Sequence, residues 1–465
     1  MKKNDERIAK VTAIGINGEG IVKDEDRVVF VPFALPNEII KYKVLKITSK
    51  CVYGKLVEIL EKSPDRVNPF CPVFNKCGGC QLQHISYFKQ LEYKRNNIKD
   101  TFKKVAHLDV EVCDCVVGDS DKRYRNKLQL PIVQNANGVE IGFYAENSHR
   151  VIPITDCLIN AEWIIAIISS TKIFMQTFNL KGYSEDGLGD IREVTAREIE
   201  GKLIITLVCL RQIRNVDKYV NILRKNLNKE FSLYININAS KNNVIYGKEF
   251  TLIYGDGTYQ GEMLGIKFPM SVESFMQVNT SVCKKLYSTV KQKLDTKDNS
   301  VVIDAYSGAG LMSALIAKDS EKVIGVEYVK EAVELSNKLA KNNNLDNVFN
   351  FQGKCEDIMP DIIAKEKQKG SSISLVIDPP RKGCDIKVIN AILDSKIDRI
   401  VYVSCMPSTL ARDVGLLVGT LKFEDGKIVN NITSEFNYKI EAIIPFDMFP
   451  HTKHVETLVV LNRDL

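Results

Sequence analysis

Three cysteines near the start of the chain have a spacing suited to a metal centre. Cys71, Cys77 and Cys80 are separated by five and then two residues, and Gly78 and Gly79 lie between the last two. Glycines leave the backbone free to wrap around a metal ion or cluster. The residues alone permit zinc or an iron–sulfur centre. Four other cysteines could supply the fourth ligand: Cys51, Cys113, Cys115 or Cys157.

A glycine-rich turn near residue 305 predicts a site for a small molecule. A hydrophobic stretch, 301–303, runs into Asp304-Ala305-Tyr306-Ser307-Gly308-Ala309-Gly310, and Glu327 ends the next predicted strand. Such a turn brings backbone close to a ligand at the carboxyl end of a strand, and an acid at the end of the next strand accepts hydrogen bonds from a ribose diol. The turn lacks the lysine of a phosphate-binding loop. The pattern is typical of S-adenosylmethionine sites, with a generic nucleotide site as the alternative.

A lone cysteine, Cys405, follows the predicted strand 399–403 and precedes a predicted helix. A helix N-terminus favours the thiolate form, so this position suits a nucleophile. A lone cysteine in such a sheet is more often a small buried apolar residue. The nearby methyl-donor site favours the nucleophile, because methylation at carbon requires a target that has first been made nucleophilic. The stretch Asp378-Pro379-Pro380 taken alone would instead favour methylation of an amino group, which needs no thiolate.

The elements that must position these groups divide into three predicted domains. Residues 1–62 contain five short Val- and Ile-rich strands separated by turn residues, which predicts an OB-like β-barrel. Residues 63–268 predict a central α+β domain that carries the cysteine loop and a helix over 87–105 with Lys94 on its exposed face. Residues 269–465 alternate strands and helices, which predicts an α/β, doubly wound (Rossmann-like) domain.

Composition excludes several classes of protein. The chain has 465 residues, a net charge of +6 and 45% hydrophobic residues, far from a disordered or low-complexity composition. No apolar run reaches the length of a membrane span, and Asp5 and Glu6 lie where a signal peptide would need apolar residues. We therefore expect a cytoplasmic protein without a membrane partner. A monomer is the default expectation for this architecture.

In order along the chain, several motifs resemble those of the RNA uracil-5-methyltransferase family, whose members make 5-methyluridine in ribosomal or transfer RNA. The resemblance covers nearly the full length, and the first 62 residues resemble the TRAM domain that is usual in the ribosomal members. Two positions depart from the usual motifs, Met406 after the nucleophile and Leu311 after the glycine turn, and they bear on fine substrate contacts. The matching segments are 275–279, 304–310, Glu327, 378–383, 404–413 and 449–457.

The resemblance implies roles for particular residues. Cys405 is implied as the nucleophile and Glu456 as the base, with His451 and His454 close to it in the sequence. It further implies a 4Fe–4S cluster held by Cys71, Cys77, Cys80 and Cys157, in a structural or RNA-positioning role. The residues implied to bind S-adenosylmethionine are Gln277, Tyr306, Glu327 and Asp378.

The chemistry of uracil explains why a thiol and a carboxylate are both needed. C5 of uracil is a poor nucleophile until a thiolate adds at C6 and turns C4–C5 into an enolate. After C5 takes the methyl group, a base must remove the remaining C5 proton before the thiolate can leave. The target base must also leave its stack to reach the thiolate, so we expect a flipped uridine.

Cations surround one aromatic residue in the segment 122–127, and such a stretch can hold phosphates while the ring stacks on a base. A charged strand edge is the alternative. The sequence as a whole favours a 23S rRNA (uracil-5-)-methyltransferase, with transfer RNA as the alternative substrate and a non-catalytic ribosome assembly factor as the alternative class. Retention of both Cys405 and Glu456 argues against the assembly factor. The predicted RNA contacts are Arg123, Tyr124, Arg125 and Lys127.

Overall fold

An N-terminal barrel opens the computed structural model, which describes residues 1–463 apart from 137, 185, 297–299, 396 and 432–436. Its strands close in the order β1-β2-β3-β5-β4, as the OB-like prediction requires. Alternating apolar residues turn inward to form a core of its own, which includes Val22, Tyr42 and Val52. The strands are β1 (Glu6–Ile14), β2 (Gly20–Asp24), β3 (Arg27–Val31), β4 (Ile39–Ile47) and β5 (Val52–Glu61).

A long helix then connects the barrel to the rest of the chain. Helix α1 (Tyr87–Thr101) continues as a π-helical turn, η1 (Phe102–Ala106). Its apolar side packs into the core of the C-terminal domain through Ile98 and Phe102. The prediction that Lys94 lies on the exposed face is wrong, since its side chain is 0% exposed. The helix has partners on more than one side, which its own periodicity does not reveal.

The central domain is a mixed sheet with two helices packed against it. Its strand order is β12-β11-β10-β9-β6-β7-β8, and β10 and β11 run parallel. Residues of both helices share one core with the sheet. The elements are β6 (Lys127–Asn135), β7 (Gly138–Tyr144), β8 (Val151–Pro153), α2 (Trp163–Thr177), β9 (Ile191–Ile199), β10 (Lys202–Cys209), α3 (Val216–Asn226), β11 (Phe231–Ile237) and β12 (Phe250–Tyr254).

A hairpin and a helix lead into the C-terminal domain. Strands β13 (Tyr259–Met263) and β14 (Ile266–Met270) pair antiparallel, and α4 (Thr280–Leu294) follows. The Asn279 side chain caps α4 by accepting a hydrogen bond from the Val282 N–H at 3.3 Å. The hairpin and α4 pack against the C-terminal sheet in one core.

The C-terminal domain is a seven-stranded sheet in the order β17-β16-β15-β18-β19-β23-β22. The first five are parallel and β23 runs antiparallel to β19. This confirms the doubly wound α/β prediction. The strand order reverses between β15 and β18, where such sheets bind ligands beyond the carboxyl ends of the strands. The strands are β15 (Ser300–Ala305), β16 (Lys322–Glu327), β17 (Val348–Gln352), β18 (Ser372–Ile377), β19 (Arg399–Ser404), β22 (Tyr438–Phe446) and β23 (Glu456–Arg463).

Helices cover both faces of this sheet and form a separate core on each. A small hairpin of β20 (Leu421–Glu424) and β21 (Lys427–Asn430) lies outside it. No described helix is long and apolar enough to cross a membrane. The helices are α5 (Leu311–Ala317), α6 (Lys330–Asn342), α7 (Cys355–Gln368), α8 (Ile386–Ser395) and α9 (Pro407–Val418).

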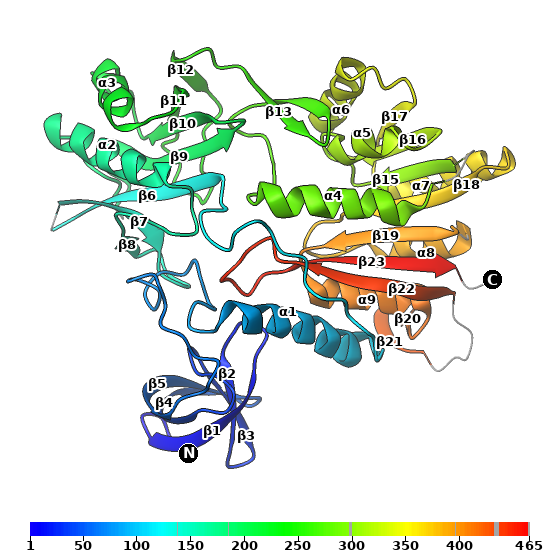
Figure 1. The fold of residues 1–465 in the computed structure, drawn as a ribbon, viewed down its shortest axis with the longest axis horizontal. Helices are drawn as coiled ribbons and strands as arrows, with labels where there is room; N and C mark the ends of the chain where they lie inside the picture. The colour runs from blue at the N-terminus through cyan, green and yellow to red at the C-terminus, as the bar shows by residue number, and fades with distance from the viewer. Residues whose placement is uncertain (137, 185, 297–299, 396, 432–436, 464–465) are drawn as a thin grey trace.

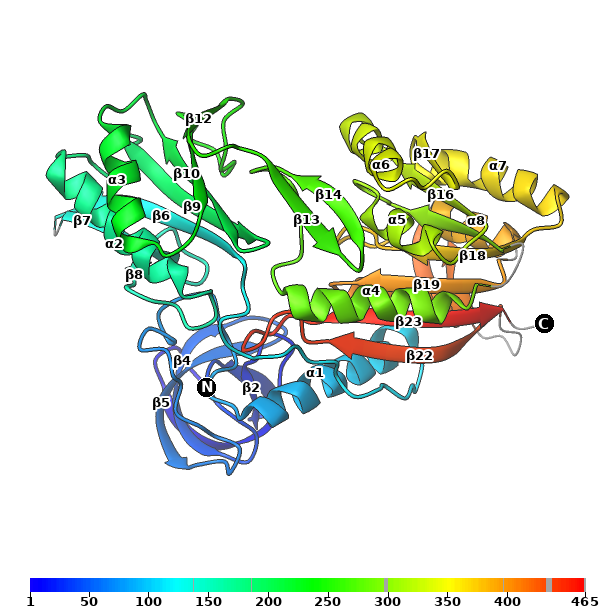
Figure 2. The same cartoon turned by 45° about the horizontal axis from the view of Figure 1, so that its top comes forward.

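The three parts meet around one loop. The connection between β22 and β23, Asp447–Val455, extends from the red end of the C-terminal sheet towards the barrel and the central domain (Figures 1 and 2). Helix α1 runs along the same sheet, and its first turn, on the side of the barrel, lies near that loop (Figure 1). The β22–β23 loop therefore lies where all three parts of the molecule can contact it.

Candidate active site

The glycine-rich turn lies at the carboxyl end of β15 and is tied to the next strand. Gly308 donates its N–H to Glu327 Oε2 at 3.0 Å, and Val329 donates to Oε1 at 2.8 Å. Gly310 has φ +81°, and a Cβ there would lie 1.8 Å from Ser336 Oγ, so only glycine fits. The turn therefore holds the Glu327 carboxylate at the edge where a ribose diol would bind.

Two further residues shape this turn. Asp304 is buried and accepts a hydrogen bond from Ser313 Oγ at 2.5 Å. Burial raises the pKa of Asp304 to about 7. Tyr306 adopts φ +63°, a left-handed conformation that is uncommon outside glycine and is found where surrounding structure enforces it. Its ring is directed towards the core that contains Cys384.

Gln277 lies in the loop before α4, and a segment of the central domain positions that loop. The Asn126 N–H donates to the Val278 carbonyl at 2.9 Å, and Asn126 Nδ2 donates to the Gln277 carbonyl at 3.2 Å. Asn126 Nδ2 also donates to Thr280 Oγ1 at 3.0 Å. The predicted RNA-contact segment is therefore joined by hydrogen bonds to the loop predicted to hold S-adenosylmethionine.

Cys405 and Glu456 come together because their strands are neighbours. Ser404 on β19 pairs with Thr457 on β23, so Cys405 just after β19 lies beside Glu456 at the start of β23. Glu456 is only 5% exposed, and burial followed by the charge of Asp378 raises its pKa to about 8. The electrostatic influence of Asp378 and Glu456 on Cys405 shows that all three groups converge. The sheet thus assembles a thiol and a carboxyl at one point.

The thiol of Cys405 is not activated in the way its sequence position predicts. Its pKa is raised, chiefly by burial and then by the Glu456 carboxylate. The expected preference for thiolate at the N-terminus of α9 is outweighed, because burial and two neighbouring acids destabilise the thiolate more than the helix N-terminus stabilises it. Arg381 acts in the opposite direction and lowers the pKa of the thiol by its charge and a hydrogen bond.

Arg381 is a candidate site residue that the sequence motifs do not single out. It follows Asp378-Pro379-Pro380, and its guanidinium acts on both Cys405 and Glu456. A cation beside the thiol stabilises a thiolate. The signal that could identify it is its position directly after Asp378-Pro379-Pro380.

The four cysteines assigned to the cluster line one cavity of about 170 Å³. Gly79 N–H donates to Cys77 Sγ at 3.4 Å, and Asn160 Nδ2 donates to Cys157 Sγ at 3.3 Å. Of the four candidate fourth ligands, Cys157 lines this cavity. Within the described residues, however, no three His, Cys, Asp or Glu side chains are grouped closely enough to hold a single metal ion. The structure thus brings the four thiols to one cavity.

The predicted RNA contacts lie between the cysteine cavity and the active site. Arg123 donates two hydrogen bonds of 2.7 Å to the Asp156 carboxylate, next to Cys157. The Tyr124 hydroxyl donates to the Pro450 carbonyl at 3.0 Å. Arg125 lines the cysteine cavity, and burial lowers the pKa of Lys127 to about 8. Arg123 and Tyr124 thus have partners within the protein, and RNA contact by this segment stays a prediction.

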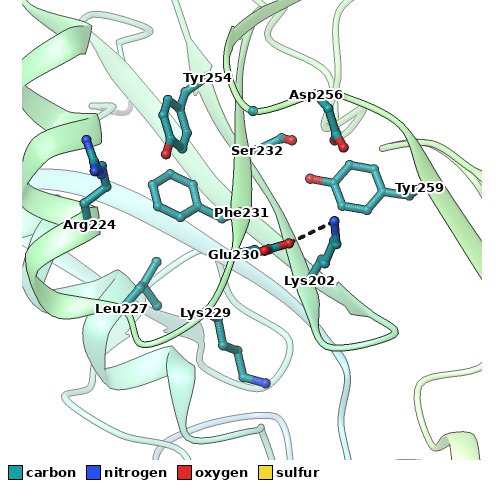
Figure 3. A pocket seen from close by; sticks show the side chains of 11 residues that line it. Lys202, Arg224, Leu227, Lys229, Glu230, Phe231, Ser232, Tyr254, Asp256 and Tyr259 are labelled. Carbon is teal, nitrogen blue, oxygen red and sulfur yellow. Dashed lines mark ion pairs between the residues drawn. The ribbon is translucent and has the colours of Figure 1, made fainter.

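A cavity of about 450 Å³ lies elsewhere, in the central domain between α3 and β10–β13. Lys202 forms an ion pair with Glu230 inside it, at 2.8 Å (Figure 3). Phe231 and Tyr254 face each other there with ring centroids 5.0 Å apart (Figure 3). None of the predicted catalytic or methyl-donor residues lines this cavity. Although this cavity is large, its lining residues do not identify it as the active site.

The doubly wound sheet, the glycine turn with Glu327, and the paired thiol and carboxyl define a methyltransferase class of site. The family model for tRNA (uracil-5-)-methyltransferases matches residues 86–464, and the chain belongs to this family. It is an RNA methyltransferase that depends on S-adenosylmethionine.

Relatives cover almost the whole chain. An uncharacterized RNA methyltransferase of Clostridium tetani is 36% identical over 467 residues, covering 99% of this chain and 97% of its own. One from Clostridium acetobutylicum is 36% identical over 471 residues, covering 100% and 98%. The crystal structure of Pyrococcus abyssi tRNA (uracil-54, C5)-methyltransferase with S-adenosyl-L-homocysteine shares the fold, with a TM-score of 0.75, 24% identity, and coverage of 98% and 99%.

Proposed function

We propose that this protein methylates C5 of a uridine in 23S rRNA, with Cys405 as nucleophile and Glu456 as base. The observation that carries the proposal is the pairing of β19 with β23, which places a thiol beside a buried carboxyl at the ligand-binding edge of the sheet. Methylation of an amino group would need neither a thiol nor a second proton acceptor. Methylation of a pyrimidine carbon needs both.

The first half of the reaction belongs to Cys405. Its thiolate adds to C6 of the flipped uracil, and the electron pair of the C5–C6 double bond moves to C5 and the C4 carbonyl. Arg381 beside the thiol favours the ionised form, against burial and the neighbouring acids. S-adenosylmethionine would supply an electrophilic methyl group to C5, with cleavage of its S–CH3 bond and release of S-adenosyl-L-homocysteine, and the residues that would hold it are Gln277, Tyr306, Glu327 and Asp378.

The second half belongs to Glu456. C5 then carries a methyl group and a hydrogen, and the Glu456 carboxylate removes that hydrogen as a proton. The C5–C6 double bond re-forms as the Cys405 thiolate leaves. A pKa of about 8 suits this step, because the basic carboxylate takes a proton readily near neutral pH.

Transfer RNA is the second candidate substrate, and one observation favours it. The match to the Pyrococcus abyssi tRNA enzyme covers 98% of this chain, including its N-terminal barrel region. The barrel alone therefore does not separate ribosomal from transfer RNA. We retain 23S rRNA because of the resemblance of residues 1–62 to the TRAM domain of ribosomal members.

The test supplies purified protein with methyl-labelled S-adenosylmethionine and either unmodified 23S rRNA or bulk transfer RNA. We expect label in 5-methyluridine from 23S rRNA, lost in Cys405→Ala. Label only in transfer RNA would retain the chemistry and overturn the substrate. Tight RNA binding with no label in either RNA would favour the assembly factor.

We further propose that Cys71, Cys77, Cys80 and Cys157 bind a 4Fe–4S cluster. A cluster is larger than one metal ion, so four thiols around a common cavity suit it better than they suit zinc. The cluster supplies no step in the methylation, so its role is to fix the structure around it.

Anaerobic purification tests the cluster directly. We expect a brown protein with iron and sulfide in equal amounts, and loss of both in Cys157→Ser. The exposed Cys113 does not line the cavity, so Cys113→Ser serves as the matched control. A colourless protein with one equivalent of zinc would overturn this proposal and leave the methylation proposal standing.

A further inference from the structure

Glu456 is the first residue after the β22–β23 loop. Phe446 at the end of β22 pairs with Glu456 at the start of β23, so the nine residues Asp447–Val455 close directly onto the carboxyl-bearing residue. Any displacement of the loop therefore moves the backbone that carries Glu456. What holds the loop also sets where the carboxyl points.

The beginning of the loop is held by a buried ion pair. Lys94 Nζ lies 2.5 Å from Asp447 Oδ1, and both side chains are 0% exposed. Lys94 also donates to the Phe449 carbonyl at 3.0 Å, and the Tyr87 hydroxyl donates to Asp447 Oδ2 at 2.8 Å. These contacts tie the loop to α1, but the last of them, at Phe449, is seven positions before Glu456.

The middle of the loop is held by His451, which is 3% exposed. The Gln90 side chain contacts this residue twice: Oε1 accepts the His451 backbone N–H at 3.1 Å, and Nε2 lies 3.2 Å from the ring Nδ1. The Gln90 amide nitrogen can only donate, so the ring Nδ1 is the acceptor of this hydrogen bond, and burial lowers the pKa of His451. The other nitrogen, Nε2, then donates to Asp121 Oδ2 at 3.0 Å.

The His451 carbonyl is engaged as well. It accepts the backbone N–H groups of Gln81 and Leu82 at 3.1 and 3.0 Å, from the segment that follows Cys80. The residue has φ +67°, which costs energy for a non-glycine residue and persists only where the surroundings enforce it. Three separate segments therefore fix both the backbone and the ring of His451.

Resting on the proposed function, we infer that His451 is a positioning residue for the proton-removing half of the reaction. Its contacts to Gln90, Asp121 and the Gln81–Leu82 backbone fix the β22–β23 loop so that the Glu456 carboxyl meets the C5 proton. His451 itself touches no reacting atom. Cys405 follows β19 and lies outside this loop, so we expect addition at C6 and methyl transfer not to depend on His451.

A role of His451 in only the second half of the reaction predicts a specific kinetic result. A residue needed only for folding would slow both halves alike, whereas loss of His451 should leave methyl transfer intact and delay the release of product. The species that then accumulates is methylated RNA still bonded to Cys405. It survives denaturing electrophoresis and carries label from S-adenosylmethionine.

The experiment compares full-length wild type with Glu456→Gln, His451→Ala and Gln90→Leu. For His451→Ala we expect the labelled adduct to accumulate and turnover to fall by about tenfold, while single-turnover methyl transfer changes by less than about threefold. His451→Asn, which restores an acceptor near Nδ1 and tolerates the left-handed backbone, should recover part of the loss. The matched control is His107→Ala, since His107 is also left-handed, at φ +56°, but exposed.

The outcomes separate this inference from the proposed function. If Glu456→Gln accumulates adduct but His451→Ala and Gln90→Leu, with unchanged melting temperatures, do not, the role of His451 is overturned. Equal slowing of methyl transfer and release also overturns it. If His451→Ala does not fold, Gln90→Leu decides by the same criterion. If wild type makes no 5-methyluridine and Glu456→Gln traps no adduct, the proposed function itself fails.

Discussion

Two buried carboxyl groups stand at opposite ends of the β22–β23 loop, and their surroundings differ completely. Asp447 is 0% exposed and is bound by the Lys94 ammonium and the Tyr87 hydroxyl. Glu456 is 5% exposed, and within the described residues its carboxyl forms no ion pair and no hydrogen bond. Burial raises the pKa of Glu456 to about 8.

This difference indicates that the Asp447 carboxyl stabilises the fold, whereas the Glu456 carboxyl is suited to take part in a reaction. A buried charge with a good partner is a fixed part of the fold, and removing its partner is costly. A buried carboxyl without a hydrogen-bond or ion-pair partner has a higher pKa than an ordinary carboxylic acid. A raised pKa is the property expected of a proton acceptor that works near neutral pH. The loop is therefore held at one end by a paired carboxyl and is followed at its other end by the carboxyl that we propose as the base.

The sharpest test of the comparison is removal of the unpaired carboxyl. We expect Glu456→Gln to lower turnover by about 10²–10⁴-fold, the usual worth of a general base, without loss of stability. Steady-state incorporation of labelled methyl into released RNA measures the effect. Glu441→Gln on β22 is the matched control, because Glu441 forms exposed ion pairs away from the site. A normal rate of release of methylated RNA by Glu456→Gln would contradict the proposed role of Glu456 as the base.

Removal of the partner of the paired carboxyl should act on stability instead. We expect Lys94→Met to lower the free energy of unfolding by about 3–5 kcal/mol, because it leaves Asp447 charged and buried without its cation. Denaturant titration measures the change. Adding Asp447→Leu should recover most of the loss, since replacing both members of a buried pair is often neutral. If the double variant does not recover the free energy of unfolding, loss of the ion pair is not the cause of the destabilisation.

The pH dependence of the second half of the reaction should follow Glu456. Once the methylated adduct has formed, its decay requires the ionised carboxylate, so the decay rate should rise about tenfold per pH unit below the pKa and level off above it. With a pKa of about 8, the rise should cover pH 6 to 8. Pre-formed adduct shifted to different pH values gives the rates. A flat profile in wild type would contradict the assignment, whereas Glu456→Gln should be slow and flat.

The last prediction concerns a pH-dependent difference in stability. The pKa of Glu456 is about 8 in the folded chain, against an ordinary value of 4.5. The stabilisation from the neutral folded carboxyl is complete below pH 4.5 and is lost progressively as the pH rises to about 8. Glu456→Gln should therefore gain melting temperature relative to wild type from pH 5 to pH 8. A constant difference over that range would show that the pKa is not raised.

Much of the site could be predicted because it depends on local backbone geometry. Gly310 is needed where a Cβ would collide, and Glu327 follows directly from the length of β16. The alternation of strands and helices predicted the doubly wound sheet, which the structure confirms. Cys405 and Glu456 were named from motifs, and the pairing of β19 with β23 places them side by side.

Other features depended on contacts that no short segment contains. Lys94 looks like one more surface lysine on a basic helix, and its burial depends on Asp447, 353 positions away. The helix N-terminus after Cys405 predicts a favoured thiolate, but burial and Glu456 reverse the direction. Arg381 acquires its influence on the thiol only when β18 and β19 lie next to each other.

By itself, then, the sequence predicted the main elements and the candidate reacting groups and determined the family to which the chain belongs, since these depend on residue types and on neighbours along the chain. Tertiary structure alone decided which charges are paired and what holds the β22–β23 loop. Burial and pairing depend on residues from distant parts of the chain, because the free energy of a charge depends on everything that surrounds it.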